Sequence, residues 1–160
     1  MVEDHFFTNK YVEKVPESLK PLYAEKWKIA QNLQYLAQGA IEPLVSEFTK
    51  DLVIYSGFIH AGRNNNYNMS PHGTGEAVDI FVDGWDINMF HLVGEIMKMV
   101  KNRNVCEIGL CFNQRSWIHL GIVGANHMFN GNVTKPRFFT RDFATGQAWS
   151  GFFPARGLMR

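Results

Sequence analysis

The chain has 160 residues, of which 46% are hydrophobic and 19% are charged, a composition typical of one packed domain rather than a disordered tail. Its formal net charge is +1 at pH 7 and it has no basic run, so neither nucleic acid nor an anionic membrane is expected as a partner. The N-terminus, MVEDHFFTNKYVEKVPES, lacks the apolar core of a secretory signal, and no segment approaches the ~20 apolar residues of a membrane span. We therefore expect synthesis in a cytoplasm.

The first half of the chain predicts a helix, a short strand and a long loop. Apolar residues recur at helical spacing over 22–48, and Pro43 is expected to kink or divide this helix. The segment DLVIYSG (51–57) is typical of a short buried strand. Residues 58–75 are rich in Asn, Gly and Ser without an apolar period, which predicts a loop, and a loop of this length is usually functional. The apolar stripe of the helix comprises Trp27, Leu33, Leu36, Ala37, Ala40, Ile41, Leu44, Val45 and Phe48.

The second half predicts three further strands. The last two should pair antiparallel across a hairpin loop at 113–116. Cys106 and Cys111 stand in one strand on opposite faces, so they cannot bridge each other and are expected to be reduced core residues. The predicted strands are 76–82, 106–112 and 117–123.

A second helix is predicted over 86–100, with Asp86 as its N-cap. Its expected apolar face consists of Phe90, Val93, Ile96, Met97 and Val100. The segment from residue 126 to the end has no clear period and is read as irregular. It carries Phe129, Phe138, Phe139, Phe143, Trp149, Phe152 and Phe153.

Strand alternation places Asp79 and His119 on strand faces opposite the apolar side chains. A carboxylate in an apolar strand is costly to bury unless it is paired, and a bound cation is one such partner. His72 adds a second imidazole, and Gly73 and Gly75 allow a tight turn between it and the strand. Two imidazoles, one carboxylate and a water form the open arrangement of a catalytic zinc site. On spacing alone, a strand histidine is more often a hydrogen-bonded core residue.

Three segments resemble the zinc D-alanyl-D-alanine carboxypeptidases and L-alanyl-D-glutamate endopeptidases. This family cuts peptidoglycan stem peptides and includes phage endolysins and tail-associated lysins. The similar segments are YSGF (55–58), SPHGTGEAVDI (70–80), which matches the family's Ser-x-His-x-x-Gly-x-Ala-x-Asp, and SWIHLGI (116–122), which matches its Trp-x-His. Their order and gaps also agree, so the similarity extends over about residues 25–123.

The resemblance implies that His72, Asp79 and His119 bind Zn²⁺. It also implies a single α+β domain with a small, mostly antiparallel sheet and helices packed on one face, as the tally of strands and helices suggests. A phage gene product of this kind would be made in the host cytoplasm. The expected divisions are an N-terminal arm (1–24), a zinc peptidase-like domain (25–125) and an aromatic C-terminal extension (126–160).

One residue of the family pattern is missing from the loop after the first strand. Many members carry an arginine there that holds the substrate carboxylate or polarises its carbonyl. Ile59 occupies this position and cannot do either. Arg63 and His60 are the candidate replacements from the same loop.

A second missing residue is the acid three positions before the last histidine, which serves many members as general base. Ser116 stands there and cannot accept a proton near neutral pH. Glu107 is the preferred candidate base, because Glu76 should point away from Asp79. The alternative interpretation of Glu107 is a solvated strand charge.

Two functions follow from this pattern. The first is a hydrolase, a zinc metallopeptidase whose substrate is the peptidoglycan stem peptide. The second is a catalytically weakened or inactive peptidase-like fold that serves as a structural component of a phage virion, in the tail or baseplate. In that case the aromatic extension, 126–160, would contact other virion proteins.

Overall fold

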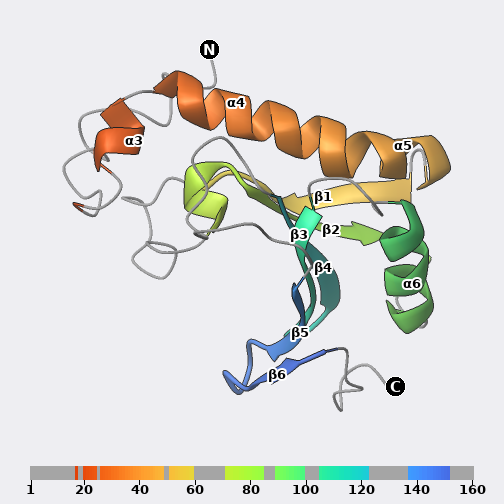
Figure 1. The fold of residues 1–160 in the computed structure, drawn as a ribbon. Helices are drawn as coiled ribbons and strands as arrows, with labels where there is room; N and C mark the ends of the chain where they lie inside the picture. Colours follow the sequence, from red (N-terminus) through yellow and green to blue (C-terminus); the bar gives the residue numbers. More distant parts are fainter. Residues whose placement is uncertain are drawn as a thin grey trace.

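The computed structural model describes residues 17, 20–24, 26–48, 51–59, 71–84, 89–99, 105–122 and 137–151. Their centre is a six-stranded sheet in the order β1-β2-β4-β3-β5-β6 (Figure 1). Strand β5 runs parallel to β3, and the other neighbouring pairs are antiparallel. The strands are β1 (Leu52–Ser56), β2 (Ala77–Val82), β3 (Val105–Phe112), β4 (Ser116–Ile122), β5 (Arg137–Asp142) and β6 (Ala148–Ser150). The predicted α+β fold with a mostly antiparallel sheet is confirmed.

The N-terminal helix runs through Pro43 without dividing. It follows the short helix α3 (Lys20–Ala24) and comprises α4 (Lys26–Leu36), a π-helical turn (Ala37–Ile41) and α5 (Glu42–Phe48). Proline has no N–H to donate and its ring collides with the carbonyl four residues earlier in a regular helix. The wider π turn, in which the Glu42 N–H donates to the Ala37 carbonyl, absorbs this conflict. Of the two outcomes expected at Pro43, a kink or a division, the division is therefore wrong, and the helix is instead distorted into a π turn just before the proline.

The extra residue in the π turn also changes which residues face the sheet. The buried positions before, within and after it recur every four residues, at Leu36, Ala40, Leu44 and Phe48. Trp27 and Val45 were predicted in the apolar stripe but are 59% and 47% exposed, respectively. A regular 3.6-residue period cannot anticipate the shift of phase that affects Val45. Trp27 precedes the turn, and on a regular helix it already lies about 180° around from Leu36.

Helix α6 (Met89–Met99) lies inside the predicted range of 86–100, whereas the N-cap expected at Asp86 lies outside the described residues. Its buried face is set by Met89, Leu92, Val93 and Ile96. Phe90 was predicted on this face but is 40% exposed, because it lies about 100° around the helix from Met89. None of the helices in the described ranges is long and apolar enough to cross a membrane.

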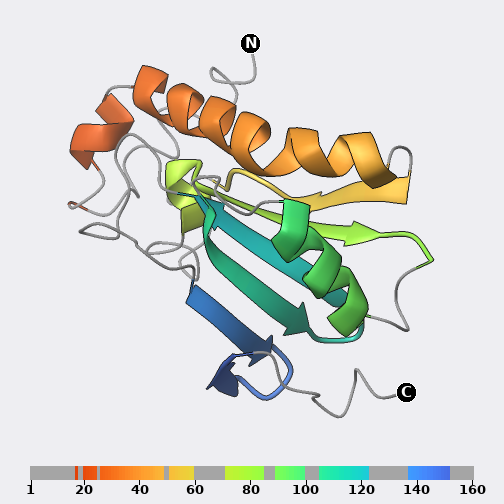
Figure 2. The ribbon, with the colours of Figure 1, turned by 45° about the vertical axis from the view of Figure 1, so that its right-hand side comes forward.

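The hydrophobic core forms between the helices and one face of the sheet (Figure 2). Helices α4, α5 and α6 contribute Leu36, Leu44, Phe48, Leu92 and Ile96, and β2, β3 and β4 contribute the aliphatic residues that alternate with the polar ones. The strand residues of this core are Val78, Ile80, Val82, Val105, Ile108, Leu110, Ile118, Leu120 and Ile122. The helices therefore pack on one face, as expected, and we call the opposite face of the sheet the site face.

Residues 137–151 were expected to be irregular but form β5 and β6, which complete the sheet (Figure 2). The two strands are joined by a turn in which the Asp142 carboxylate accepts backbone N–H bonds from Ala144 and Thr145. Gly109 on β3 leaves space for the Phe139 ring of β5, because a Cβ at this position would lie 2.1 Å from that ring. The expectation was wrong because β5 is stabilised by pairing with β3, and β6 by pairing with β5, which a local period does not reveal.

Replacing Gly109 tests this packing. We expect Gly109→Ala to lower the free energy of unfolding by about 1–3 kcal/mol, because the new methyl group overpacks against Phe139. The same change should cost less in a Phe139→Leu background, which a double-mutant cycle from urea unfolding measures. Gly94→Ala, in α6 with nothing within 4 Å of its Cβ, is the matched control and should be neutral or stabilising. Equal effects of Gly109→Ala in both backgrounds would contradict this packing.

Candidate metal centre

Strand pairing places the central site residues in one row across the site face. Asp79 on β2 lies directly opposite His119 on β4, and His119 lies opposite Gly109 on β3. The row continues to Ser56 on β1 and to Phe139 on β5. Because side chains in one row of a sheet share a face, the carboxylate of Asp79 and the imidazole of His119 meet without any loop to bring them together.

His72 reaches the same point from a 3₁₀ turn (Pro71–Thr74) just before β2. The turn is fixed on two sides: the Asn32 side chain of α4 donates to the Thr74 carbonyl at 2.9 Å, and Nδ1 of His72 lies 2.8 Å from the Gly57 carbonyl. Gly75 has φ +78°, the left-handed conformation that glycine adopts without strain, as predicted. Gly73 was given the same role but lies within the 3₁₀ turn and has no positive φ.

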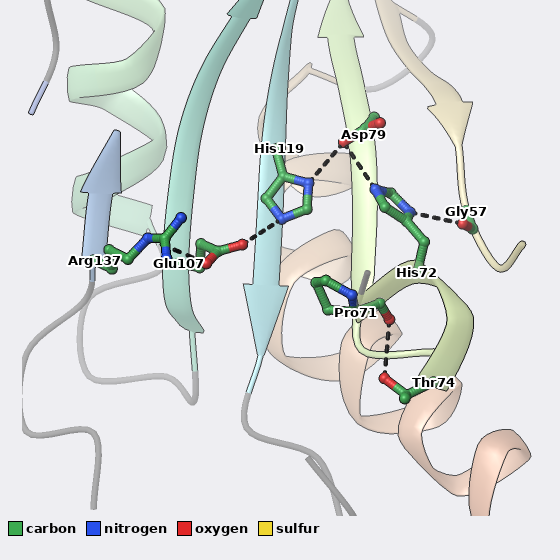
Figure 3. A network of polar contacts seen from close by, with 8 residues as sticks. All are labelled: Gly57, Pro71, His72, Thr74, Asp79, Glu107, His119 and Arg137. Carbon is green, nitrogen blue, oxygen red and sulfur yellow. Dashed lines mark hydrogen bonds and ion pairs between the residues drawn. The ribbon is translucent and has the colours of Figure 1, made fainter. Parts of the chain in front are cut away.

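The three predicted ligands converge (Figure 3). Oδ1 of Asp79 lies 2.9 Å from Nδ1 of His119 and 3.3 Å from Nε2 of His72. The ligand atoms of all three residues lie within 4.8 Å of one another. His72 and His119 are buried, and the side chain of Asp79 is only 14% exposed. His72, Asp79 and His119 therefore form a cluster that could hold a metal ion.

The protonation of the cluster follows from its burial and its hydrogen bonds. Burial by itself lowers the pKa of His119, but bonds to the Asp79 and Glu107 carboxylates outweigh it and raise the pKa to about 9. Burial raises the pKa of Asp79, and the hydrogen bonds from His119 and His72 outweigh it, holding this pKa below its ordinary value. Without a metal, a positively charged His119 therefore stabilises the carboxylate buried in β2.

Glu107 holds the opposite side of the His119 ring. Its Oε1 lies 2.7 Å from Nε2 of His119, and its Oε2 lies 3.5 Å from Nε of Arg137 on β5 (Figure 3). A β-bulge between Val105 and Glu107 directs Val105 into the core and Glu107 to the site face. Gly121 leaves room for the contact, since a Cβ there would lie 3.1 Å from Cβ of Glu107. Glu107 is thus a buried partner of His119 rather than a solvated strand charge.

The fixed ring nitrogens decide how a metal can approach. Nε2 of His119 faces Glu107, and Nδ1 of His72 faces the Gly57 carbonyl. A proton on each of these nitrogens leaves Nδ1 of His119 and Nε2 of His72 as the coordinating atoms, both beside Oδ1 of Asp79. Acceptors behind metal-binding imidazoles typically fix the ring orientation and the tautomer in this way.

Of the other residues singled out in the sequence, Glu76 and the two cysteines do not belong to this cluster. Arg63 and His60 lie outside the described residues, so their predicted roles stay predictions. Glu76 is buried just before β2, and its backbone carbonyl accepts the Ile122 N–H. Both cysteines are free and buried, as expected, and burial raises the pKa of the Cys106 thiol to about 11.

Sequence analysis missed several residues that build the site. Asn32 is fully buried in α4, where a polar residue in an apolar helix face was the signal. Arg137 and Phe139 belong to β5, which has no apolar alternation and whose local clue was only the turn Asp142–Gly146 that follows it. The ring of Phe139 lies 5.8 Å from that of His119, and the Arg137 guanidinium lies over Phe139 at 5.0 Å. These residues come from distant segments, so only pairing reveals their role.

Comparison of the chain with protein-family models, with curated proteins and with solved structures finds no match.

The stability of the metal-free protein should depend on pH through His119. Its pKa is raised from 6.5 to about 9, so its contribution is complete below pH 6.5 and is lost as the pH rises through 9. The lowered pKa values of Asp79 and Glu107 act at the other end, since their contributions are lost as the pH falls below about 4.5. Urea unfolding of chelator-treated protein between pH 6.5 and 9 measures the first loss. His119→Gln should remove this part of the dependence, whereas an unchanged profile in that variant would assign it to another group.

The contact behind His119 should tune metal binding. We expect Glu107→Gln to weaken the affinity for a divalent metal about 10- to 100-fold, because an uncharged amide is a poorer acceptor for the ring N–H. Competition with a chromophoric chelator gives the affinity. The control is Glu95→Gln on α6, which removes a carboxylate paired with Lys98 and should have no effect. Equal affinities in Glu107→Gln and the native protein would show that the contact does not support the metal.

Proposed function

We propose that this protein is a zinc-dependent peptidase that acts on the stem peptides of peptidoglycan and is encoded by a phage. The convergence of His72, Asp79 and His119 is the observation that carries the proposal. The activity class comes from the resemblance of residues 70–80 and 116–122 to the family motifs. The geometry supports that resemblance, because the motif positions that hold zinc in the family are the three residues that meet here.

The donor set fits zinc rather than a hard cation such as magnesium. Two imidazole nitrogens and one carboxylate oxygen are ligands of catalytic zinc sites, in which three protein groups leave a further position open. Both imidazoles have an acceptor on the far nitrogen, the Gly57 carbonyl for His72 and Glu107 for His119. Binding would displace the proton that His119 shares with Asp79, so the metal would take over the charge compensation of this buried carboxylate.

A zinc ion held by His72, Asp79 and His119 would supply a Lewis acid, able to polarise a carbonyl group and activate a water molecule. The contribution of the chain is to hold the three ligands in position. The β2–β4 pairing fixes Asp79 beside His119, and the 3₁₀ turn fixes His72 through Gly57. These ligands therefore need little rearrangement to bind the metal, which lowers the cost of assembling the site.

Within this proposal Glu107 is first a positioning residue for His119. Both of its oxygens are engaged, one by Nε2 of His119 and the other near Arg137. To act as general base it would have to release one of these partners, so the base role stays a prediction. Ser116, at the position where the family has its acid, lies at the start of β4.

A second candidate is a metal-binding domain with little or no turnover that serves as a structural part of a phage tail or baseplate. The engagement of Glu107 favours it, together with Ile59 and Ser116 at the positions of the family's arginine and acid. Loss of a general base typically lowers a rate about 10²- to 10⁴-fold. Of the aromatic extension, Phe138 and Phe139 pack within the domain, while Phe152 and Phe153 lie outside the described residues.

Zinc analysis and hydrolysis together test the proposal. Purified protein should contain about one zinc per chain and release D-Ala or cleaved stem peptide from peptidoglycan. His119→Ala should lose both, because it removes one ligand and the partner of Asp79. His91→Ala, which removes an exposed histidine of α6, is the matched control and should keep both.

The outcomes separate the two candidates. Stoichiometric zinc without release of any product would favour the structural role. A native protein that binds no zinc at micromolar concentration would contradict both the metal centre and the peptidase. Hydrolysis that survives His119→Ala would place the chemistry elsewhere in the chain.

A further inference from the structure

The row of the site face next to the metal cluster is aromatic. Trp117 lies two residues before His119 on β4, and Phe81 lies two residues after Asp79 on β2. Tyr55, at the bulge of β1, contacts both, with ring centroids 5.4 Å from Trp117 and 6.2 Å from Phe81. A substrate bound at the cluster therefore has an aromatic surface beside it, in contact with the same strands.

A cavity of about 290 Å³ opens above this surface and is lined by hydrogen-bond donors. Its lining residues are Tyr55, Asn113, Gln114, Arg115 and Trp117, none of them acidic. The guanidinium of Arg115 lies over the Phe81 ring, 4.8 Å from its centroid, which holds the flexible side chain over the sheet. The hairpin turn that carries Arg115 is itself closed by the Asn113 N–H, which donates to the Arg115 carbonyl at 2.9 Å.

Arg115 is the one charged residue among the described residues that line the pocket. Among the described residues no carboxylate lies within ion-pair distance of Arg115, whereas Arg137 on the same face has Glu107. A guanidinium offers a planar fork of donors that matches the two oxygens of a carboxylate, and the neighbouring amides and phenol add further donors. We infer that this pocket is a subsite for a carboxylate of the substrate, with Arg115 as its specificity-determining residue.

The spacing along the strands indicates which carboxylate fits. Asp79 and Phe81, the residue under the Arg115 guanidinium, are two residues apart on β2, a span of about 6.6–6.8 Å along a strand. An extended peptide substrate advances about 3.3–3.6 Å per residue. The bound carboxylate should thus lie about two residues from the bond at the metal, with apolar groups between them over Tyr55 and Trp117. This inference rests on the proposed peptidase function for the identity of the substrate. It assigns carboxylate recognition to the β3–β4 hairpin rather than to the loop that carries Ile59.

Binding of two peptides, measured by calorimetry, tests the subsite. The first is a synthetic stem pentapeptide with free carboxylates, and the second is the same peptide with each carboxylate converted to an amide. The native protein should prefer the acidic peptide, and Arg115→Gln should weaken its binding about tenfold while leaving the amide form nearly unchanged. Arg115→Lys keeps the charge without the fork and should fall between. The matched control is Arg141→Gln, a guanidinium stacked on Phe143 outside the pocket, which should change the affinity less than twofold.

Each titration is run on zinc-loaded and on chelator-treated protein, so that the subsite and the metal centre are tested separately. A preference for the acidic peptide that depends on Arg115 but is present without zinc supports the subsite even if no zinc binds and no peptide is cleaved. Equal binding of the two peptides, no binding of either, or equal losses in Arg115→Gln and Arg141→Gln would overturn the inference. If Arg115→Gln cleaves stem peptides and keeps the native preference for the acidic peptide, the peptidase proposal is supported and the carboxylate subsite is refuted.

Discussion

The carboxylate of Asp79 is the constraint on which the site face depends. It lies in the middle of β2, and the residues on either side of it, Val78 and Ile80, are buried. Burial disfavours the charged form of this carboxylate. His119 and His72 compensate it at 2.9 Å and 3.3 Å. A proton on His119 fills this role in the metal-free protein, and a divalent ion bound by the same atoms would fill it with greater charge. The structural requirement and the proposed metal site are therefore one interaction.

The compensation extends through the whole domain. Asn32 of α4 holds the turn that carries His72, and Glu107 of β3 holds the far side of His119. Arg137 of β5 in turn lies beside Glu107. A helix from the start of the described chain and a strand from its end thus act on the same pair of imidazoles. Strand β5 therefore supports the cluster of His72, Asp79 and His119 through Glu107.

The site face is divided into rows with different chemistry. One row carries Glu107 and Arg137, the next carries Asp79 and His119, and the third carries Phe81 and Trp117. Strand pairing fixes the spacing of these rows. The rows are nevertheless coupled, because the Glu107 side chain crosses from its own row to contact His119 in the next.

Much of the fold followed from local patterns. Alternation in β2 and β4 placed Asp79 and His119 on the face opposite the aliphatic residues, and helical spacing predicted the long helix and α6. The phase shift at the π turn was not predictable from a regular period, so Val45, which follows the turn, was assigned to the wrong face. Periods describe single elements, and they fail where one element departs from its ideal geometry.

By itself, the sequence determined the main helices and strands between residues 26 and 122, the two faces of β2 and β4, and the three candidate ligands. The tertiary structure alone decided that β5 and β6 join the sheet, that a bulge directs Glu107 toward His119, and that Arg137 and Asn32 support the cluster. The reason is physical. Face and period are fixed by neighbours along the chain, whereas partners across strands and behind an imidazole come from segments far apart, which meet only when the sheet has formed.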